Sequence, residues 1–176
     1  MKKIESITIK SEPDYDNDLS YIGEYTDSLD LGNIVIATGQ MITKRTKEED
    51  LPERGREFRA FKPYAGGEKY GSKYYKKYAL QDFAHIERID RGDVSFIGIR
   101  AVAEVHTSRD GRNWHIQEIT GGSLWGIESD SGESYFKEIG ADCLSELVAE
   151  LEEFGFTTKQ ISAASVEYNF FTVSIQ

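Results

Sequence analysis

The feature that most constrains the fold is a pair of alternating segments on either side of Asp110-Gly111. Residues 94–107 and 113–120 alternate apolar with polar side chains, a pattern that is typical of strands with one buried face. Asp-Gly between such segments favours a tight turn, because both central residues of that turn need positive φ. The sequence therefore predicts an antiparallel hairpin. Its core face is expected to carry Ile97, Ile99, Ala101, Ala103, Val105, Trp114 and Ile116.

A two-residue turn at this place would fix which residues of the hairpin face each other. His106 would lie opposite His115, and Glu104 opposite Gln117. Directly opposed Cβ atoms lie ~4.5–5.5 Å apart, close enough for two imidazoles and Glu104 to share a metal. The other interpretation is a solvated polar face, which we favour because no further ligand or supporting shell is evident. We therefore predict no metal and no cofactor, with His106, His115 and Glu104 as the candidate ligands if one binds.

Two segments show the apolar spacing of amphipathic helices. Apolar side chains recur three or four residues apart between residues 73 and 91, and Gly92 follows where a helix would end. A cleaner stripe runs from Asp142, a residue type suited to helix N-caps, to Phe154, with Gly155 as the terminating glycine. Shorter apolar runs predict strands at residues 4–9, 33–37, 124–127 and 165–175. These elements predict an α+β fold, a mainly antiparallel sheet with two helices packed on one face.

Length and composition fit a single folded domain over residues 1–176. The chain falls within the usual range of ~100–200 residues per domain, and its apolar fraction of 39% supports a core. Residues 43–72 are polar and contain several glycines and prolines. So long a loop in a compact domain is usually functional or disordered. We predict a mobile or partner-ordered segment at about 43–72.

Charge and cysteine content limit the compartment and the class of partner. The net charge is −10, but residues 44–91 carry 13 bases and nine acids while residues 92–176 carry five bases and 14 acids. This balance argues against general coating of nucleic acid, yet it leaves room for a local basic patch or a basic partner. The one cysteine, Cys143, cannot form a disulfide within the chain, and no signal peptide or membrane-spanning run is evident. We expect a cytoplasmic protein in which Cys143 serves in packing.

The stretch from Lys62 to Tyr78 interleaves lysines with tyrosines and offers a candidate binding surface. Tyrosine rings stack on bases while lysines contact phosphates in proteins that bind single-stranded nucleic acid. The competing interpretation, which the overall negative charge favours, is that some tyrosines anchor a loop to the core and the lysines keep it soluble. The candidate binding residues in this stretch are Tyr64, Lys69, Tyr70, Lys73 and Tyr74.

A second candidate surface lies around residues 121–130. Trp125 can fill a gap between sheet and helix, and the glycines around it permit backbone approaches that other residues cannot make. Glu128 and Asp130 follow a predicted strand, where they could assist a metal-dependent hydrolysis or cap the next segment. We take Trp125, Glu128 and Asp130 as candidate binding residues and assign no catalytic residue.

Three stretches of the chain resemble a loose group of uncharacterised phage, plasmid and bacterial proteins. They are DLSYIGEYTD (18–27), QDFAHIERIDRGDVSFIGIRAVAEV (81–105) and GGSLWGIESDSGESYFKEI (121–139), the last of which contains a GG-x-LWGIESDS box. The resemblance implies no established activity, so it assigns no functional residue, and residues 44–70 lie outside it. It does imply a phage or mobile-element context and accessory functions in the cytoplasm.

Segregated charge without a catalytic pattern favours a small non-enzymatic binding or interaction protein. Either the acidic second half or the stretch 43–78 would contact a macromolecule, which we expect to be a protein rather than nucleic acid. An acidic decoy that occupies a basic groove on a defence protein is one specific version. One alternative is a small metal-assisted hydrolase built on the candidate ligands around His106 or on Glu128 and Asp130. The other is a single-stranded nucleic-acid binder that uses Lys62–Tyr78.

Overall fold

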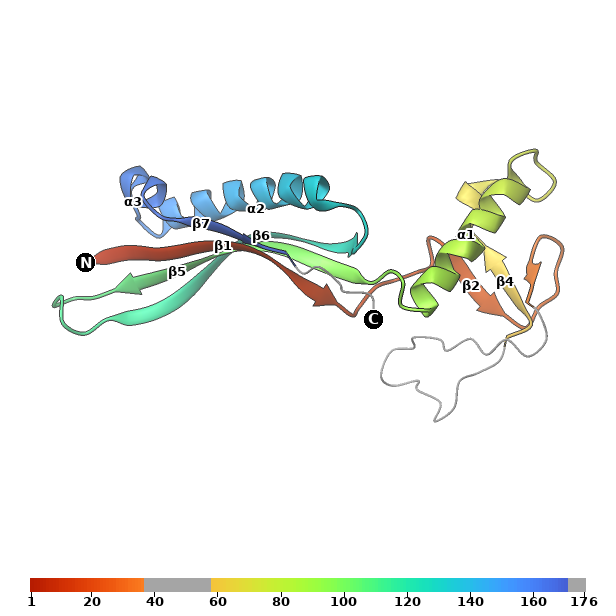
Figure 1. The fold of residues 1–176 in the computed structure, drawn as a ribbon, viewed down its shortest axis with the longest axis horizontal. Coiled ribbons are helices and arrows are strands. Elements are labelled where there is room, and N and C mark those ends of the chain that lie inside the picture. Colours follow the sequence, from red (N-terminus) through yellow and green to blue (C-terminus); the bar gives the residue numbers. More distant parts are fainter. Residues whose placement is uncertain (37–57, 171–176) are drawn as a thin grey trace. The chain divides into compact units, whose positions relative to one another are not determined.

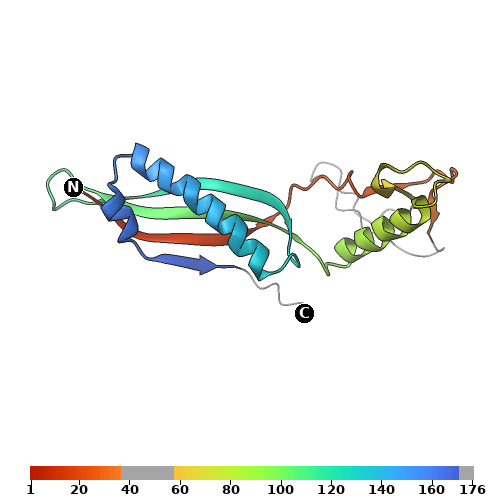
Figure 2. The same cartoon turned by 90° about the horizontal axis from the view of Figure 1, so that it is seen from above.

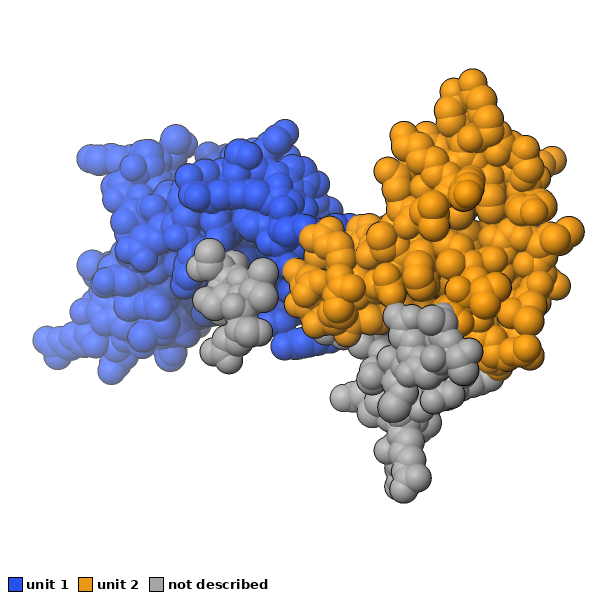
Figure 3. All heavy atoms as spheres, turned by 45° about the vertical axis from the view of Figure 1, so that its right-hand side comes forward, with its two compact units in different colours: residues 1–15, 95–176 blue, residues 16–94 orange. Residues whose placement is uncertain are grey.

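The computed structural model describes residues 1–36 and 58–170, and the chain forms two compact units (Figure 3). Unit 1 contains residues 1–15 and 95–176, and unit 2 contains residues 16–94. Along the chain, unit 2 is therefore an insertion after the first strand of unit 1. Each unit has its own sheet and its own long helix. That the whole chain acts as a single domain stays a prediction.

Unit 1 is built on a four-stranded sheet (Figure 1). Its long strands β1 (Lys2–Asp14), β5 (Phe96–Thr107) and β6 (His115–Glu128) are antiparallel, and the short β7 (Val166–Asn169) runs parallel to β1. The order across the sheet is β6-β5-β1-β7, so the hairpin partner β6 lies at one edge. The predicted hairpin and the α+β class with mainly antiparallel strands are confirmed.

Helix α2 (Glu133–Glu153) lies along one face of this sheet (Figure 2). The sequence predicted a start at Asp142, whereas the helix begins at Glu133. The prediction was too short because Phe136 and Gly140 extend the buried stripe before Asp142, a residue that lies inside the helix and does not cap it. The residues that α2 buries are Phe136, Gly140, Cys143, Leu147 and Leu151.

The chain leaves α2 as the sequence predicted and then forms a short helix that it did not. Gly155 has φ of +78°, and the N–H of the buried Phe156 donates to Leu151 O at 3.0 Å. Helix α3 (Thr158–Ser162) follows, and its first turn is fixed by hydrogen bonds between Thr157 and Gln160. No helix in the described part of the chain is both long and apolar enough to cross a bilayer.

The turn between β5 and β6 is longer than the predicted two-residue turn. Residues 108–114 form a loop in which Asp110 Oδ1 accepts hydrogen bonds from the backbone N–H groups of Asn113 and Arg112, both at 2.9 Å. These hydrogen bonds hold the pKa of Asp110 well below its usual range. Gly111 supplies the positive φ, +72°, that the loop needs. The Asp-Gly signal therefore located the turn correctly but not its length.

The longer loop changes the register of the hairpin. His106 pairs with Ile116, and Thr107 pairs with His115, so the predicted pairing of the two histidines is wrong. Glu104 pairs with Glu118 and not with Gln117. On β5 the predicted core face is confirmed, because Ile97, Ile99, Ala101, Ala103 and Val105 are all buried. On the β6 side it is wrong, because Trp114 is 37% and Ile116 66% exposed.

Unit 2 contains a three-stranded sheet against which α1 (Tyr75–Asp90) packs. Strand β4 (Ala60–Pro63) lies between β2 (Gly23–Thr26) and β3 (Ile34–Val35) and is antiparallel to both. A 3-10 turn, η2 (Ala65–Gly67), follows β4. The helix predicted between residues 73 and 91 is confirmed. The two long helices of the chain therefore cover two separate sheets.

Part of the loop predicted at about 43–72 is a buried strand instead. Phe58 and Phe61 are buried, and the rings of Phe61 and Phe83 have centroids 5.6 Å apart, which ties β4 to α1. Pattern reasoning missed β4 because charged side chains at 59 and 62 interrupt its few apolar residues. Residues 43–57 of the predicted loop lie outside the described residues.

Candidate functional site

The structure does not bring the two candidate histidines together. His106 pairs with Ile116, and the next pair along the two strands joins Thr107 to His115. Because side chains of successive pairs point to opposite faces of a sheet, the two histidines lie on opposite faces. Glu104 does lie beside His106, with Oε1 2.8 Å from Nε2. Across the described ranges, no group of three or more His, Cys, Asp or Glu side chains is placed to hold a metal ion. The predicted ligand set of His106, His115 and Glu104 is therefore not assembled.

Trp125 has a structural contact that explains its place in the chain. Its ring lies over the backbone of Gly98 on β5, where a Cβ atom would meet Trp125 Cε3 at 2.1 Å. The indole N–H donates to Ser123 Oγ at 3.1 Å. The next residue, Gly126, has φ of +76° and donates its N–H to Asp14 Oδ2 at 2.9 Å. Trp125 remains about half exposed, but its position is set by packing within the sheet.

The first glycine of the GG-x-LWGIESDS box sets the distance between β6 and α2. A Cβ atom on Gly121 would lie 2.5 Å from the Cα, Cβ and N atoms of Leu147. A Cβ atom on Gly122 would instead meet the carboxylate of Glu146, at 2.0 Å from Oε2. Helix α2 can therefore pack this closely only because β6 carries no side chain at Gly121.

Glu128 and Asp130 belong to the turn that joins β6 to α2. Glu128 ends β6 and pairs with Phe96, while Asp130 is exposed in the turn. Between them, Ser129 holds the turn, since its N–H donates to Ser95 O at 2.8 Å and its Oγ accepts from Ser95 N–H at 3.0 Å. This geometry favours the structural interpretation of the segment over a catalytic one.

Cys143 is a packing residue in this structure. It is buried between α2 and the sheet, and its Sγ lies 3.5 Å from Ile99 O, to which the thiol donates. Burial raises the pKa of the thiol above its usual value. A thiol that is protonated and shielded from solvent is a poor nucleophile.

The lysine–tyrosine stretch forms one exposed surface at the start of α1. We call it the α1 surface and define it as Tyr64, Lys69, Tyr70, Lys73, Tyr74, Lys76 and Lys77, all of which are exposed. Residues 69–80 contain four lysines and no carboxylate. Among the residues that the structure describes, none is ion-paired with any of these four lysines. The predicted binding residues of this stretch are therefore all exposed, and none of its four lysines is neutralised by a described carboxylate.

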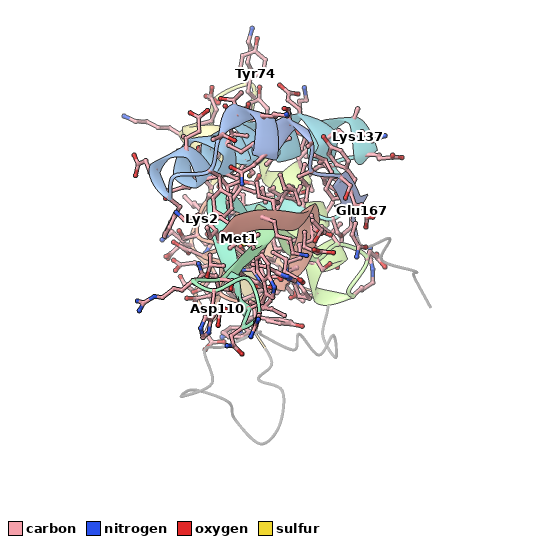
Figure 4. The ribbon with its side chains drawn as sticks, turned by 90° about the vertical axis from the view of Figure 1, so that its left-hand side faces the viewer. Met1, Lys2, Tyr74, Asp110, Lys137 and Glu167 are labelled. Carbon is pink, nitrogen blue, oxygen red and sulfur yellow. The ribbon has the colours of Figure 1, made fainter. Side chains whose placement is uncertain are left out.

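The tyrosines of the stretch divide into anchors and exposed rings. Tyr75 is partly buried and donates its hydroxyl to Gly32 O at 2.8 Å, which fixes the start of α1 to the turn before β3. Tyr70 stands on Tyr75 edge-to-face, with centroids 5.5 Å apart and an interplanar angle of 85°. Tyr74 points away from the ribbon (Figure 4), and Lys73 Nζ lies 4.5 Å from the centre of its ring. Tyr75 thus fits the interpretation of an anchor, while Tyr74 is exposed, as a binding surface would require.

A hollow of about 420 Å³ opens beside the α1 surface, wholly within unit 2. It lies between the turn at residues 30–34 and the first turns of α1. The side chains that matter most for its chemistry are Leu31, Ile34, Tyr70, Tyr75, Lys76 and Leu80. Leu31 is 83% and Leu80 51% exposed. Sequence reasoning missed both leucines, because single apolar residues in a polar turn and on the outer face of a helix carry no periodic signal.

The outer face of α2 is strongly acidic. Seven carboxylates of this helix are exposed, against a single lysine, Lys137, which pairs with Glu133 at 2.6 Å. Glu138, Asp142, Glu146 and Glu150 follow one another at four-residue intervals. Such like-charged neighbours each destabilise a helix by roughly 0.2–0.5 kcal/mol. Half of the 14 acids of residues 92–176 thus lie on this one helix.

Comparison of the chain with protein-family models, with curated proteins and with solved structures finds no match. The resemblance to phage, plasmid and bacterial proteins therefore stays a prediction. The surfaces of the two units are the basis on which a function can be assigned.

Proposed function

We propose that this chain is a cytoplasmic, non-enzymatic binding protein that contacts a protein partner through the α1 surface. The observation that carries the proposal is the set of four lysines, at 69, 73, 76 and 77, which alternate with tyrosines and have no carboxylate between residues 69 and 80. Such a surface is complementary to an acidic partner.

The position of the lysines strengthens this argument. Lys73, Lys76 and Lys77 lie at the N-terminal end of α1, whose first turn contains no acidic residue. The helix dipole is positive at this end. Each cation close to it destabilises the helix by about 0.3–1 kcal/mol, whereas an anion there would stabilise the helix. A surface selected only for the stability of the fold would carry acids at these positions. Negative groups from a partner would reverse the cost.

The exposed side chains around the lysines favour a protein partner over nucleic acid. Tyrosine is enriched at protein interfaces, and it also stacks on bases. Exposed aliphatic side chains separate the two cases, because Leu31 and Leu80 gain from burial against apolar protein surface but offer no face for stacking. A phage or mobile-element setting is the context that we propose for this interaction. A decoy that offers the acidic face of α2 to a basic groove would use a different surface and a partner of opposite charge, so it is a separate hypothesis.

The test compares three forms of the full-length chain immobilised on resin and exposed to an extract of bacterial cells. They are the unaltered protein, a variant with Lys→Gln at 69, 73, 76 and 77, and a matched control. The control carries four Gln substitutions on exposed cations of unit 1, at Arg109, Arg112, Lys137 and Lys159, so both variants have the same net charge. Bound proteins are quantified by mass spectrometry.

We expect the resin with the α1 variant to recover about tenfold less of a partner protein than the resin with the control variant. Each exposed charge contact that is removed contributes roughly 0.2–1 kcal/mol to binding. Equal recovery on all three resins, or no recovery from folded protein, would contradict the proposal. A labelled oligo-deoxythymidine at low salt provides the second arm. Tight, salt-sensitive binding of this strand that is lost in the α1 variant would replace the protein partner with single-stranded nucleic acid.

A further inference from the structure

We infer that the hollow beside Tyr70 receives a bulky apolar side chain from an acidic segment of the partner. The inference rests on the proposed function and adds to it the kind of segment that the α1 surface recognises. It commits to a short peptide stretch in which a leucine or phenylalanine is flanked by aspartates or glutamates.

The walls of the hollow are held in place in the free protein. Tyr75 donates its hydroxyl to Gly32 O, and this bond joins the helical wall to the wall formed by the turn. Gly32 has φ of +100°, and a Cβ atom there would meet Tyr75 Oη at 2.7 Å and Tyr70 Cδ2 at 3.1 Å. The close approach of the turn to both rings therefore requires glycine. A preformed hollow avoids the cost of ordering its walls when a ligand binds.

The lining of the hollow is suited to an aliphatic or aromatic side chain. Leu31, Ile34 and Leu80 supply aliphatic surface, and Tyr70 and Tyr75 supply two rings at right angles. The volume of about 420 Å³ falls within the ~300–1,000 Å³ of small-ligand pockets, so one bulky side chain and its backbone fit. Phosphodiester strands gain little here, because bases stack on flat rings and do not insert among leucines.

The charges around the hollow set the polarity of the segment. Lys76 lines the hollow on the helical side, and Lys69 and Lys73 lie on the same stretch of chain. Asp30 lines it on the side of the turn. Carboxylates of the segment are therefore attracted towards α1 and repelled from the turn, so the acidic residues lie on the α1 side of the inserted side chain.

The experiment measures fluorescence anisotropy of labelled synthetic peptides with the full-length chain. One peptide has a central leucine between glutamates and aspartates, and the second has alanine in place of that leucine. We expect the leucine peptide to bind about tenfold more tightly, because each extra buried carbon contributes roughly a fourfold gain and the hollow is open on one side. Leu80→Ser should remove this preference.

Two further variants separate the hollow from the rest of the surface. Leu29→Ser is the matched control, since Leu29 is as exposed as Leu80, at 52% against 51%, but does not line the hollow. It should keep the preference for leucine. Tyr75→Phe retains the ring and loses the hydroxyl that fixes the walls, and it should reduce the preference. Thermal unfolding of each variant checks that the fold is retained.

The outcomes distinguish this inference from the proposed function. If both peptides bind equally and the Lys→Gln variant at 69, 73, 76 and 77 releases both, the α1 surface binds acidic chains but the hollow takes no side chain, and the inference is wrong. If neither peptide binds, the inference is likewise overturned, while the recovery of a partner from extract still decides the proposed function. If oligo-deoxythymidine binds more tightly than either peptide, both are wrong.

Discussion

Replacing Gly121 by alanine should separate α2 from the sheet, whereas the same change at Gly122 should not. The new Cβ at Gly121 would lie 2.5 Å from backbone atoms of Leu147, which cannot rotate away. At Gly122 the three nearest atoms that it would meet all belong to the exposed carboxylate of Glu146, which can rotate away. Both glycines have backbone conformations open to alanine, because neither has a positive φ. Because both variants make the same chemical change, a difference in their stability reports the effect of close packing.

The expected cost follows from the size of the overlap. Carbon atoms need about 3.5–4.0 Å, so α2 must move by roughly 1 Å, and a gap of that size forfeits a quarter to a half of the attraction at each contact it opens. Overpacking a well-packed core costs about 1–3 kcal/mol. Any Gly→Ala change also stabilises the folded state by about 0.4–1 kcal/mol, because it lowers the conformational entropy of the unfolded chain. We predict a net loss of about 1–2 kcal/mol for Gly121→Ala and within about 1 kcal/mol of no change for Gly122→Ala.

Urea unfolding followed by tryptophan fluorescence is the assay. The chain has two tryptophans, Trp114 and Trp125, and both belong to unit 1, so the signal reports the unit in which the substitutions lie. With a slope of about 1–3 kcal/mol per molar urea, the midpoint of Gly121→Ala should fall by roughly 1 M. Midpoints for the two variants that agree within error would refute the packing argument.

Two further predictions concern charge. Glu150→Lys should stabilise unit 1 by about 0.5–1 kcal/mol, because it turns a repulsion from Glu146 into an attraction and places a cation near the C-terminal end of α2. Glu150→Gln should give about half of this stabilisation in the same urea assay. An unchanged midpoint for both variants would contradict the prediction. Asp110→Asn should lower stability at neutral pH, because hydrogen bonds from Asn113 and Arg112 lower the folded-state pKa of Asp110 below the unfolded value of about 4. That contribution is complete above the unfolded pKa and is lost as pH falls towards the folded one, so the two proteins should converge below about pH 4; a difference that grows with acidification would show that the sign is wrong.

Sequence reasoning located elements well where a periodic signal was long. The alternation of β5 and the apolar stripe of α1 were sufficient to place both. It failed where local chemistry or tertiary contact decided the outcome. The register of the hairpin depends on hydrogen bonds to a single carboxylate, Asp110, and one residue of difference moves Ile116 to the other face. Strand β4 is buried between two other strands although its own residues alternate poorly.

The candidate site was predictable in part for the same reasons. The lysines and tyrosines between residues 64 and 77 could be predicted as candidates from composition, and the structure shows most of them exposed. The hollow beside them could not be predicted, because Leu31 and Leu80 are far apart in the chain and meet only through the fold of unit 2. The GG-x-LWGIESDS box suggested a binding site or a packing role. In the structure Gly121 lies against Leu147, Trp125 lies over Gly98 and Gly126 has positive φ, which favours the packing role.

The insertion of unit 2 has a consequence for how the chain acquires its structure. Asp14 pairs with Phe96, so the ends of the inserted segment meet at one rung of the β1–β5 ladder. Closing an unstructured ring costs entropy that grows with its length, and a ring ten times longer costs about 2 kcal/mol more. If residues 16–94 fold first, they shorten this ring before β1 and β5 have to find each other. Weakening unit 2 would then slow the assembly of the β6-β5-β1-β7 sheet, whose four strands all lie in unit 1.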